Sequence, residues 1–302
     1  MSPLPLLEHR LIFVTGKGGV GRTTVARALG LIAARAGQRV IIAELTPASQ
    51  APDSRAGGIA EVKLAPGLFT ITIDPQAAME EYLRVKAGAL GSALAASRIF
   101  GALAMATPGM RELLAIGKVW ELAQVQRIRE RAAPYDVVIV DAPATGHGVA
   151  ALRTPRTFAE IARVGPIARQ ASTIAATIAD PEFTAVVGVA QPEELPVSET
   201  LSLARALEKD HLRLAYVITN MCYPERFSEA EIARLESARQ DAGTLTDAPL
   251  RAAISEGRRA AAQRPYLERL RAAFGERLVT LPYLFSAEPD IRSLADRLGT
   301  QL

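Results

Sequence analysis

Residues 16–24 read Gly16-Lys17-Gly18-Gly19-Val20-Gly21-Arg22-Thr23-Thr24. The apolar run at 11–14 before them predicts a buried strand, and residues 25–34 have helical spacing. Strand, glycine-rich turn and helix, in this order, are the setting of a phosphate-binding loop. Glycines let consecutive N–H groups converge on one anion, and the helix N-terminus adds partial positive charge. We predict that residues 16–24 bind nucleotide phosphates, with Thr23 as a magnesium ligand and Thr24 on a phosphate oxygen.

Two basic residues distinguish this loop. Lys17 follows the first glycine, and Arg22 occupies the position of the usual phosphate lysine. The loop resembles the deviant Walker A sequence KGGxGK[ST] of a family of dimeric ATPases that includes the arsenite-pump ATPase ArsA, the tail-anchored-protein targeting ATPase, MinD, ParA and the nitrogenase iron protein. In that family the extra lysine reaches the partner's nucleotide, so the resemblance implies a dimer and a catalytic Lys17. Arginine at position 22 departs from the pattern and is bulkier than lysine, although simple drift in an arginine-rich chain is an alternative explanation.

Composition restricts the function classes. The chain has 302 residues, of which 49% are hydrophobic, so it can bury a large core. Its 35 basic and 32 acidic residues nearly balance, which is no argument for nucleic acid or a membrane surface as partner. A single cysteine, Cys222, excludes an internal disulfide and a CxxC zinc pair. Without a signal peptide or an apolar run near 18 residues, we expect a cytoplasmic protein with no stable membrane insertion.

Strand-like and helix-like segments alternate along the chain. We expect strands at 11–14, 39–44, 68–74, 135–141, 184–189, 212–219 and 277–281. We expect helices at 25–34, 156–180, 198–209, 228–240, 247–274 and 289–299 and a loop at 46–67. Residues 76–131 form an alanine-rich helical stretch that we expect to be broken near Gly91, Gly101 and residues 107–109. The alternation predicts an α/β fold with a doubly wound, mostly parallel sheet, as in P-loop NTPases. Segments 76–131 and 156–180 would add a helical layer to one domain that spans residues 1–302.

A second part of the site is expected where the strand at 135–141 ends. Asp141 follows four apolar residues, which is the place of a Walker B aspartate, and would hold magnesium through water. Residues 142–147 contain Gly146 and can rearrange around it, as a segment that senses the γ-phosphate must. His147 lies in this segment, and its role stays open because a lone loop histidine is usually structural.

Further motifs narrow the resemblance. Residues 141–147, Asp-Ala-Pro-Ala-Thr-Gly-His, resemble the DTAPTGH switch II of the ArsA and tail-anchored-targeting branch. Pro192-Glu193-Glu194-Leu195 with Glu199-Thr200 is similar to the segment in which a glutamate senses nucleotide across the dimer, which implies Glu193 at the nucleotide. Thr219-Asn220-Met221 matches an adenine-contacting asparagine, although an asparagine after a strand is also a common turn residue.

The resemblance extends over residues 11 to about 295. Pro282 lies in a segment similar to the family's late proline segment beside the base. The strand end at Glu44, residues 107–114 and residues 195–197 resemble the bacterial paralogues of the targeting ATPase, which can work as unequal pairs.

Two family features are missing. Where the branch carries the switch I aspartate that positions the attacking water, this chain has Thr46. Glu44 lies on the same face of an extended strand and can orient water instead, or can serve in a cap or salt bridge. Arg22 and Thr46 are therefore expected to impair ATP hydrolysis more than ATP binding. Within one chain, the single Cys222 supplies neither the metalloid cysteines nor the zinc pair of the family, although two chains could each supply one cysteine.

We therefore expect a dimeric ATPase that binds ATP and Mg²⁺ and switches conformation with its nucleotide, as a homodimer or with a paralogue. Adenine would lie near Asn220 and Pro282. The stripe from Met79 to Trp120 either binds a hydrophobic helical client or is plain core or dimer interface. The main alternative is a catalytically weak pseudo-ATPase that regulates a heterodimer. An arsenite pump fits less well because the chain has one cysteine, and a MinD- or ParA-like positioning ATPase fits less well because residues 290–302 carry no basic amphipathic excess.

Overall fold

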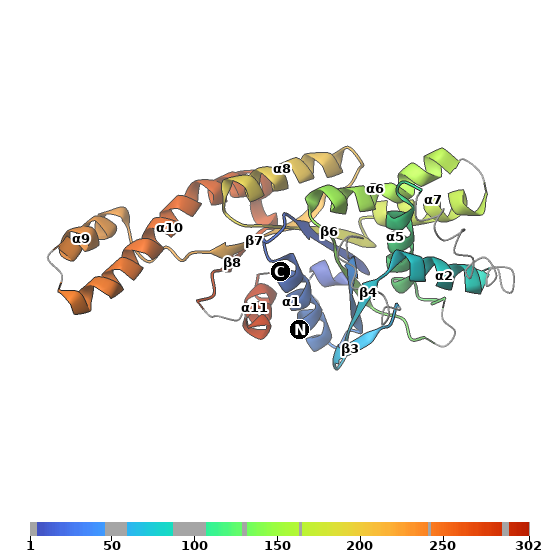
Figure 1. The fold of residues 1–302 in the computed structure, drawn as a ribbon, viewed down its shortest axis with the longest axis horizontal. Coiled ribbons are helices and arrows are strands. Elements are labelled where there is room, and N and C mark those ends of the chain that lie inside the picture. The colour runs from blue at the N-terminus through green and yellow to red at the C-terminus, as the bar shows by residue number, and fades with distance from the viewer. Residues whose placement is uncertain are drawn as a thin grey trace.

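An eight-stranded β-sheet forms the centre of the chain, as a computed structural model shows (Figure 1). The structure describes residues 5–45, 59–86, 107–128, 132–162, 165–240, 243–285 and 290–301. The strands are β1 (Leu11–Gly16), β2 (Val40–Leu45), β3 (Val62–Ala65), β4 (Leu68–Ile73), β5 (Val137–Asp141), β6 (Thr184–Ala190), β7 (Leu214–Cys222) and β8 (Leu278–Pro282). Their order is β3-β4-β2-β5-β1-β6-β7-β8, and among them only β3 runs antiparallel to its neighbour. The predicted α/β fold with a mostly parallel sheet is confirmed.

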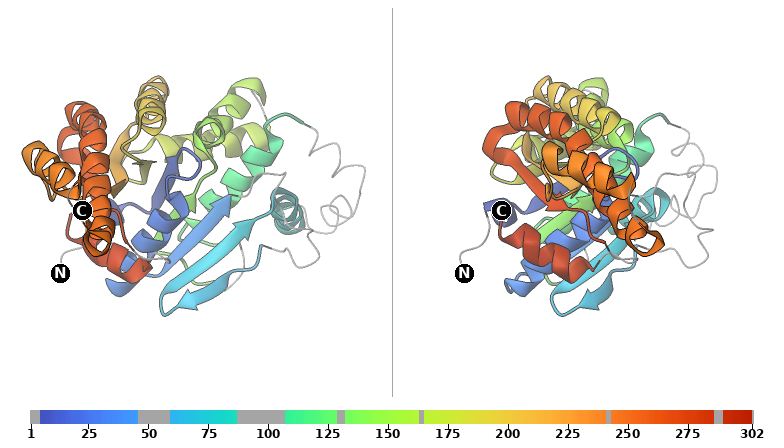
Figure 2. Two further views of the ribbon diagram at one scale, coloured as in Figure 1. Left: turned by 60° about the vertical axis from the view of Figure 1, so that its left-hand side comes forward. Right: turned by 90° about the vertical axis from the view of Figure 1, so that its left-hand side faces the viewer.

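Helices cover both faces of this sheet (Figures 1 and 2). They are α1 (Arg22–Arg35), α2 (Pro75–Lys86), α5 (Met110–Leu122), α6 (Thr145–Ala162), α7 (Pro166–Ala179), α8 (Glu194–Glu208), α9 (Glu229–Gln240), α10 (Thr244–Phe274) and α11 (Ile291–Gly299), with short 3-10 turns at Pro5–Glu8 and Gly275–Arg277. Helices α1 and α11 pack together on one face, and α5 to α8 and α10 cover the other. Helix α9 packs on the outer part of α10, and the pair projects from the sheet (Figure 1).

The core follows from the alternation of side chains along the central strand. All six residues of β1 are buried. Because successive side chains of a strand point to opposite faces, Phe13 belongs to the core layer under α5 and α8, whereas Val14 belongs to the layer under α1 and α11. The apolar residues at 11–14 of β1 therefore fill both core layers, and the buried Thr15 and Gly16 lead into the glycine-rich stretch.

The strand order places β1 at the point where the chain direction across the sheet reverses. In parallel register, Val14 of β1 and Glu44 of β2 both pair with Asp141 of β5. Parallel strands end at the same edge of a sheet, and ligands of doubly wound sheets bind outside those ends at such a reversal. The glycine-rich stretch follows β1 at this edge.

Three expected boundaries are wrong. Strand β3 lies in the expected loop at 46–67, where the turn at Pro66-Gly67 folds it back on β4, and Gly67 has φ +75°. Helix α6 begins at Thr145 and continues through Pro155, although proline removes one helical hydrogen bond. Helix α8 begins at Glu194, because Pro196 lies in the first turn, where its missing N–H costs nothing.

The described parts of the expected helical stretch at 76–131 are helix α2, up to Lys86, and helix α5, and the expected break near residues 107–109 is a turn before α5. Helix α5 ends at Leu122, earlier than the expected end near residue 131, and is followed by turns. Residues 87–106 and the first part of the expected loop, 46–58, lie outside the described residues.

A buried ionic network joins this helical layer to the sheet. Lys118, with a side chain only 3% exposed, donates to Glu81 at 2.6 Å and to Glu121 at 2.8 Å. Arg127 donates to the second oxygen of Glu121 at 2.8 Å and to Glu61, next to β3, at 2.7 Å. Burial alone would raise the pKa of Glu121, but the hydrogen bond from Arg127 and the charge of Lys118 outweigh it, so this pKa lies below its usual value.

We predict that Lys118→Met destabilises the fold by about 3–5 kcal/mol at pH 7, because it removes the buried cation that pairs with both Glu81 and Glu121 and leaves the buried Glu121 carboxylate with Arg127 as its remaining cation among the described residues. Urea unfolding measures this, with the exposed Lys209→Met as control, expected within about 0.5 kcal/mol of wild type. Since the pKa of Glu121 is lowered in the folded wild type, its contribution is present above the ordinary carboxyl pKa and is lost as pH falls through the folded value. The deficit of Lys118→Met should therefore narrow in acid. A deficit no larger than that of the control at pH 7 would contradict this role.

Candidate nucleotide site

The predicted phosphate loop connects β1 to α1 and lies tightly against the neighbouring strand ends. A Cβ on Gly16 would lie 2.2 Å from the carbonyl oxygen of Val189 in β6. Gly21 has φ +93°, and its Cβ would lie 2.3 Å from the Nδ2 of Asn220 in β7. By contrast, a Cβ on Gly18 or Gly19 would meet nothing within 4 Å. One side of the loop is thus packed against the sheet edge and the other is open, which leaves room for an anion.

Thr23 and Asp141 meet at this edge. The Thr23 hydroxyl, in the first turn of α1, donates a 2.6 Å hydrogen bond to Oδ2 of Asp141 at the end of β5. A hydroxyl and a carboxylate are hard oxygen ligands of the kind that magnesium takes together with water and substrate phosphates. Among the described residues, no group of three or more His, Cys, Asp or Glu side chains could hold a metal ion. Thr23 and Asp141 fit a magnesium ion.

Arg22 is the first residue of α1, and its guanidinium lies over the chain that leaves β5. It donates to the carbonyl oxygen of Ala142, the residue after Asp141. Burial lowers the pKa of Arg22 and the charge of Asp141 opposes this, yet a guanidinium remains charged in a protein. A fixed positive charge therefore lies beside the phosphate loop, directed at a backbone carbonyl.

Lys17 faces helix α8 of its own chain. Its Nζ lies 3.9 Å from Oε1 of Glu199, and both side chains are about one third exposed. The predicted glutamate, Glu193, is exposed at the N-cap position of α8 and makes no capping hydrogen bond there. The structure thus brings Glu199 to the loop lysine. The Glu199-Thr200 part of the α8 motif was the available signal for it.

Glu44 has a partner in helix α1. Its Oε1 lies 3.5 Å from NH2 of Arg27, and both side chains are partly exposed. The parallel register places Glu44 beside Asp141, at the same sheet edge as the loop. Within the single chain this carboxylate forms a salt bridge, which was the alternative to its orienting water. Thr46 lies outside the described residues.

Two side-chain amides reach the carbonyl oxygens of the loop. Asn220 is buried, and its Nδ2 donates to Val20 at 3.0 Å. Gln191, directly after β6, donates through Nε2 to Gly19 at 3.3 Å. Sequence reasoning missed Gln191, and its position at the carboxyl end of a strand was the only available signal.

The expected base side lies at the ends of β7 and β8. Pro282 pairs with Cys222, and the next residues, Tyr223 and Tyr283, stack with ring centroids 4.7 Å apart. Phe285 packs edge-on to Tyr283 at 5.0 Å. Burial raises the pKa of Cys222 to about 12, so its thiol stays protonated. The backbone at His147 is helical, but its side chain lies outside the described part.

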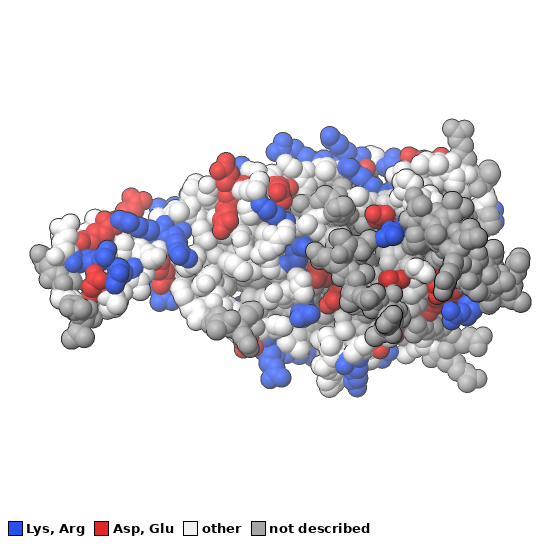
Figure 3. Space-filling view, in the orientation of Figure 1, with Lys and Arg blue, Asp and Glu red and all other residues white. Residues whose placement is uncertain are grey.

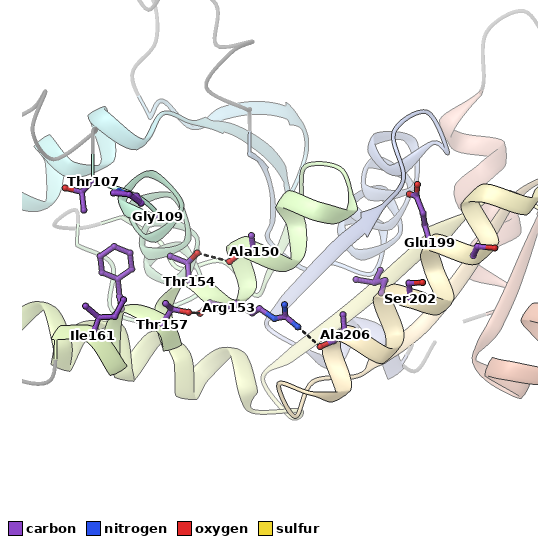
Figure 4. A pocket seen from close by; sticks show the side chains of 14 residues that line it. Thr107, Gly109, Ala150, Arg153, Thr154, Thr157, Ile161, Glu199, Ser202 and Ala206 are labelled. Carbon is purple, nitrogen blue, oxygen red and sulfur yellow. Dashed lines mark hydrogen bonds between the residues drawn. The ribbon is translucent and has the colours of Figure 1, made fainter.

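A large groove borders the loop lysine. It has a volume of about 1050 Å³ and runs between α6 and α8 (Figure 4). Phe158, Ile161 and Leu203 make much of its lining apolar, and Glu199, the partner of Lys17, stands on its α8 wall (Figure 4).

Comparison with known proteins agrees with this geometry. A family model described as anion-transporting ATPase matches residues 9–172 and 167–246. ATPase BagA of Mycobacterium tuberculosis is 32% identical over 264 residues, which cover 83% of this chain and 76% of that protein. The arsenical pump-driving ATPase of Acidiphilium multivorum is 28% identical over 247 residues, 75% of this chain and 41% of that protein.

A fungal relative extends the comparison. The ATPase get3 of Sclerotinia sclerotiorum is 24% identical over 262 residues, which cover 74% of this chain and 75% of that protein. The resemblance that the motifs indicated is confirmed. The chain belongs to the ArsA family of anion-transporting ATPases.

Proposed function

We propose that the chain binds Mg-ATP as one half of a dimer and changes conformation with its nucleotide state. The 2.6 Å hydrogen bond between Thr23 and Asp141 carries the proposal, because the two residues expected to hold magnesium lie together at the N-terminus of α1, next to the glycine-rich loop. The loop of residues 16–24 would hold the phosphates, Thr23 the magnesium directly and Asp141 through water. The ion would neutralise charge that develops on the phosphates.

The dimer is proposed from Lys17. Its 3.9 Å contact with Glu199 is at the long limit for an ion pair and partly exposed, so it adds little stability. Lys17 can therefore leave Glu199 for a phosphate of a partner chain at small cost. In a dimer, this cation would stabilise charge on the neighbour's γ-phosphate, as the family resemblance implies.

A second candidate function is a regulatory pseudo-ATPase in a heterodimer. Two contacts favour it. Arg22, at the phosphate-lysine position, donates to the carbonyl of Ala142, and Glu44, the substitute for the missing water-positioning aspartate, is paired with Arg27. A backbone cradle for phosphate survives both features, whereas hydrolysis needs a positioned water.

A hydrophobic helical client is the proposed partner besides a second copy. Helices α2, α5 and α7 enclose a cavity of about 320 Å³, lined in part by Met79, Tyr82, Leu114 and Ile174. Among the described residues, this largely apolar lining would suit apolar side chains from one face of an amphipathic helix.

Other partners have less support. On the face drawn in Figure 3, the described basic and acidic residues are interspersed, which does not suit a nucleic-acid surface. None of the described helices is long and apolar enough to cross a membrane. The cytoplasmic location stays a prediction.

The first prediction concerns Lys17. Purified chain should release phosphate from Mg-ATP, and Lys17→Ala should lower the rate by about 100-fold or more while ATP still binds, because a preorganised charge on the transferred group is lost. Lys63→Ala, at an exposed lysine of β3, is the control. ATP binding without any release would favour the pseudo-ATPase, and absence of ATP binding would refute the proposed function.

The second prediction concerns Arg22. If its planar guanidinium holds the site in a poor geometry, Arg22→Lys should raise turnover by about ten-fold, equivalent to ~1.4 kcal/mol in the barrier. Steady-state phosphate release at saturating ATP, with the ATP affinity of each variant measured separately, tests this expectation. Arg35→Lys, which keeps the charge at the far end of α1, is the control. An equal or lower rate for Arg22→Lys would remove this explanation.

The third prediction concerns the client cavity. A photo-crosslinking amino acid at Tyr82 should capture an apolar helical peptide in one nucleotide state only, because the helical layer has to move with the switch. The same amino acid at Tyr266 in α10 and a peptide of charged residues serve as controls. Equal capture with ATP and ADP, or equal capture at Tyr266, would speak for plain core packing.

A further inference from the structure

Two amide side chains donate hydrogen bonds to the expected phosphate loop, and these contacts indicate a role beyond contact with a nucleotide base. A phosphate loop works only while its N–H groups converge, which requires its carbonyl oxygens to be held on the other side. Two of these carbonyls, at Gly19 and Val20, accept hydrogen bonds from Gln191 and Asn220. Gln191 directly follows β6, and Asn220 lies near the carboxyl end of the neighbouring strand β7.

Asn220 is built for this contact. Asn220 is only 6% exposed, so its amide cannot replace the hydrogen bond to the Val20 carbonyl with one to water unless the site opens. Its Oδ1 accepts from the backbone N–H of Met221 at 2.9 Å, which fixes the orientation of the amide. The loop lies so close that a Cβ on Gly21 would be 2.3 Å from Nδ2.

The strand end that carries Asn220 is itself held in place. Met221 has φ +59°, a conformation that costs energy for a non-glycine residue. Gln263 of α10 donates through Nε2 to the Met221 carbonyl at 3.0 Å and accepts from the N–H of Tyr223 at 2.8 Å. Gln191 also contacts the Met221 sulfur at 2.9 Å. The anchor of the loop is thus continuous with the β7 end and with α10.

We propose that Asn220, assisted by Gln191, is a positioning residue that holds the phosphate loop in its anion-binding conformation, independently of any base. The proposal rests on the proposed nucleotide binding. Its consequence is that removing the amide weakens binding of the phosphate part alone. A residue that only contacts adenine would leave that part unaffected.

The test compares Mg-ATP with Mg-tripolyphosphate, which has no base, by titration calorimetry. Asn220→Ala should weaken both by a similar factor of about ten, as expected when a buried acceptor loses its donor. Gln191→Ala should weaken both by less, since its hydrogen bond is longer and more exposed. The control is Gln38→Ala, which removes an amide hydrogen bond to the Leu7 carbonyl far from the loop and should change neither.

Loss of ATP affinity with unchanged tripolyphosphate affinity in Asn220→Ala would overturn the proposal and leave a base contact. Should Asn220→Ala unfold at the assay temperature, Gln191→Ala provides the same comparison at the adjacent carbonyl.

Hydrogen exchange tests the same idea without a ligand. In the free protein, Asn220→Ala should increase deuterium uptake in peptides covering residues 16–24, and Gln38→Ala should not. No increase would overturn the proposal. If wild type binds neither ATP nor tripolyphosphate but the uptake rises, the proposed function fails while the positioning role stands.

Discussion

The close approach of the loop backbone to the ends of β6 and β7 is the constraint on which the rest of the site depends. At Gly16 and Gly21 any Cβ would come within 2.3 Å of a neighbouring atom, so only glycine allows this packing. Because one side of the loop packs against these strand ends, its other side remains open, and a Cβ on Gly18 or Gly19 would meet nothing within 4 Å. The helix α1 then starts where its unpaired N–H groups add to the same cradle.

The basic side chains around this loop already have oxygen partners within the single chain. Lys17, Arg22 and Arg27 all lie on or near the loop, and each already has an oxygen partner in the single chain: Glu199, the carbonyl of Ala142, and Glu44. In the proposed nucleotide-bound state, the phosphates would compete with Glu199 on α8 and Glu44 on β2 for these cations, which would couple the site to these two elements.

Much of the fold was accessible from local patterns. The alternation of apolar runs and helical segments predicts the parallel sheet, because buried parallel strands and amphipathic helices each have a short-range period. The misplaced boundaries have local causes too. Pro155 and Pro196 are residues that usually end helices, but they are tolerated inside α6 and in the first turn of α8. The turn at Pro66-Gly67 connects the two strands of a hairpin and does not belong to a long loop.

The sequence by itself determined the glycine-rich connection between β1 and α1, the strand that ends at Asp141, and the family, because these depend on neighbouring residues and their spacing. Only the tertiary structure decided that Gln191 and Asn220 hold loop carbonyls, that Glu199 lies at Lys17, and that Lys118 and Arg127 form a buried network. These contacts join residues far apart in the chain. They depend on strand order, register and helix placement, which no local pattern encodes.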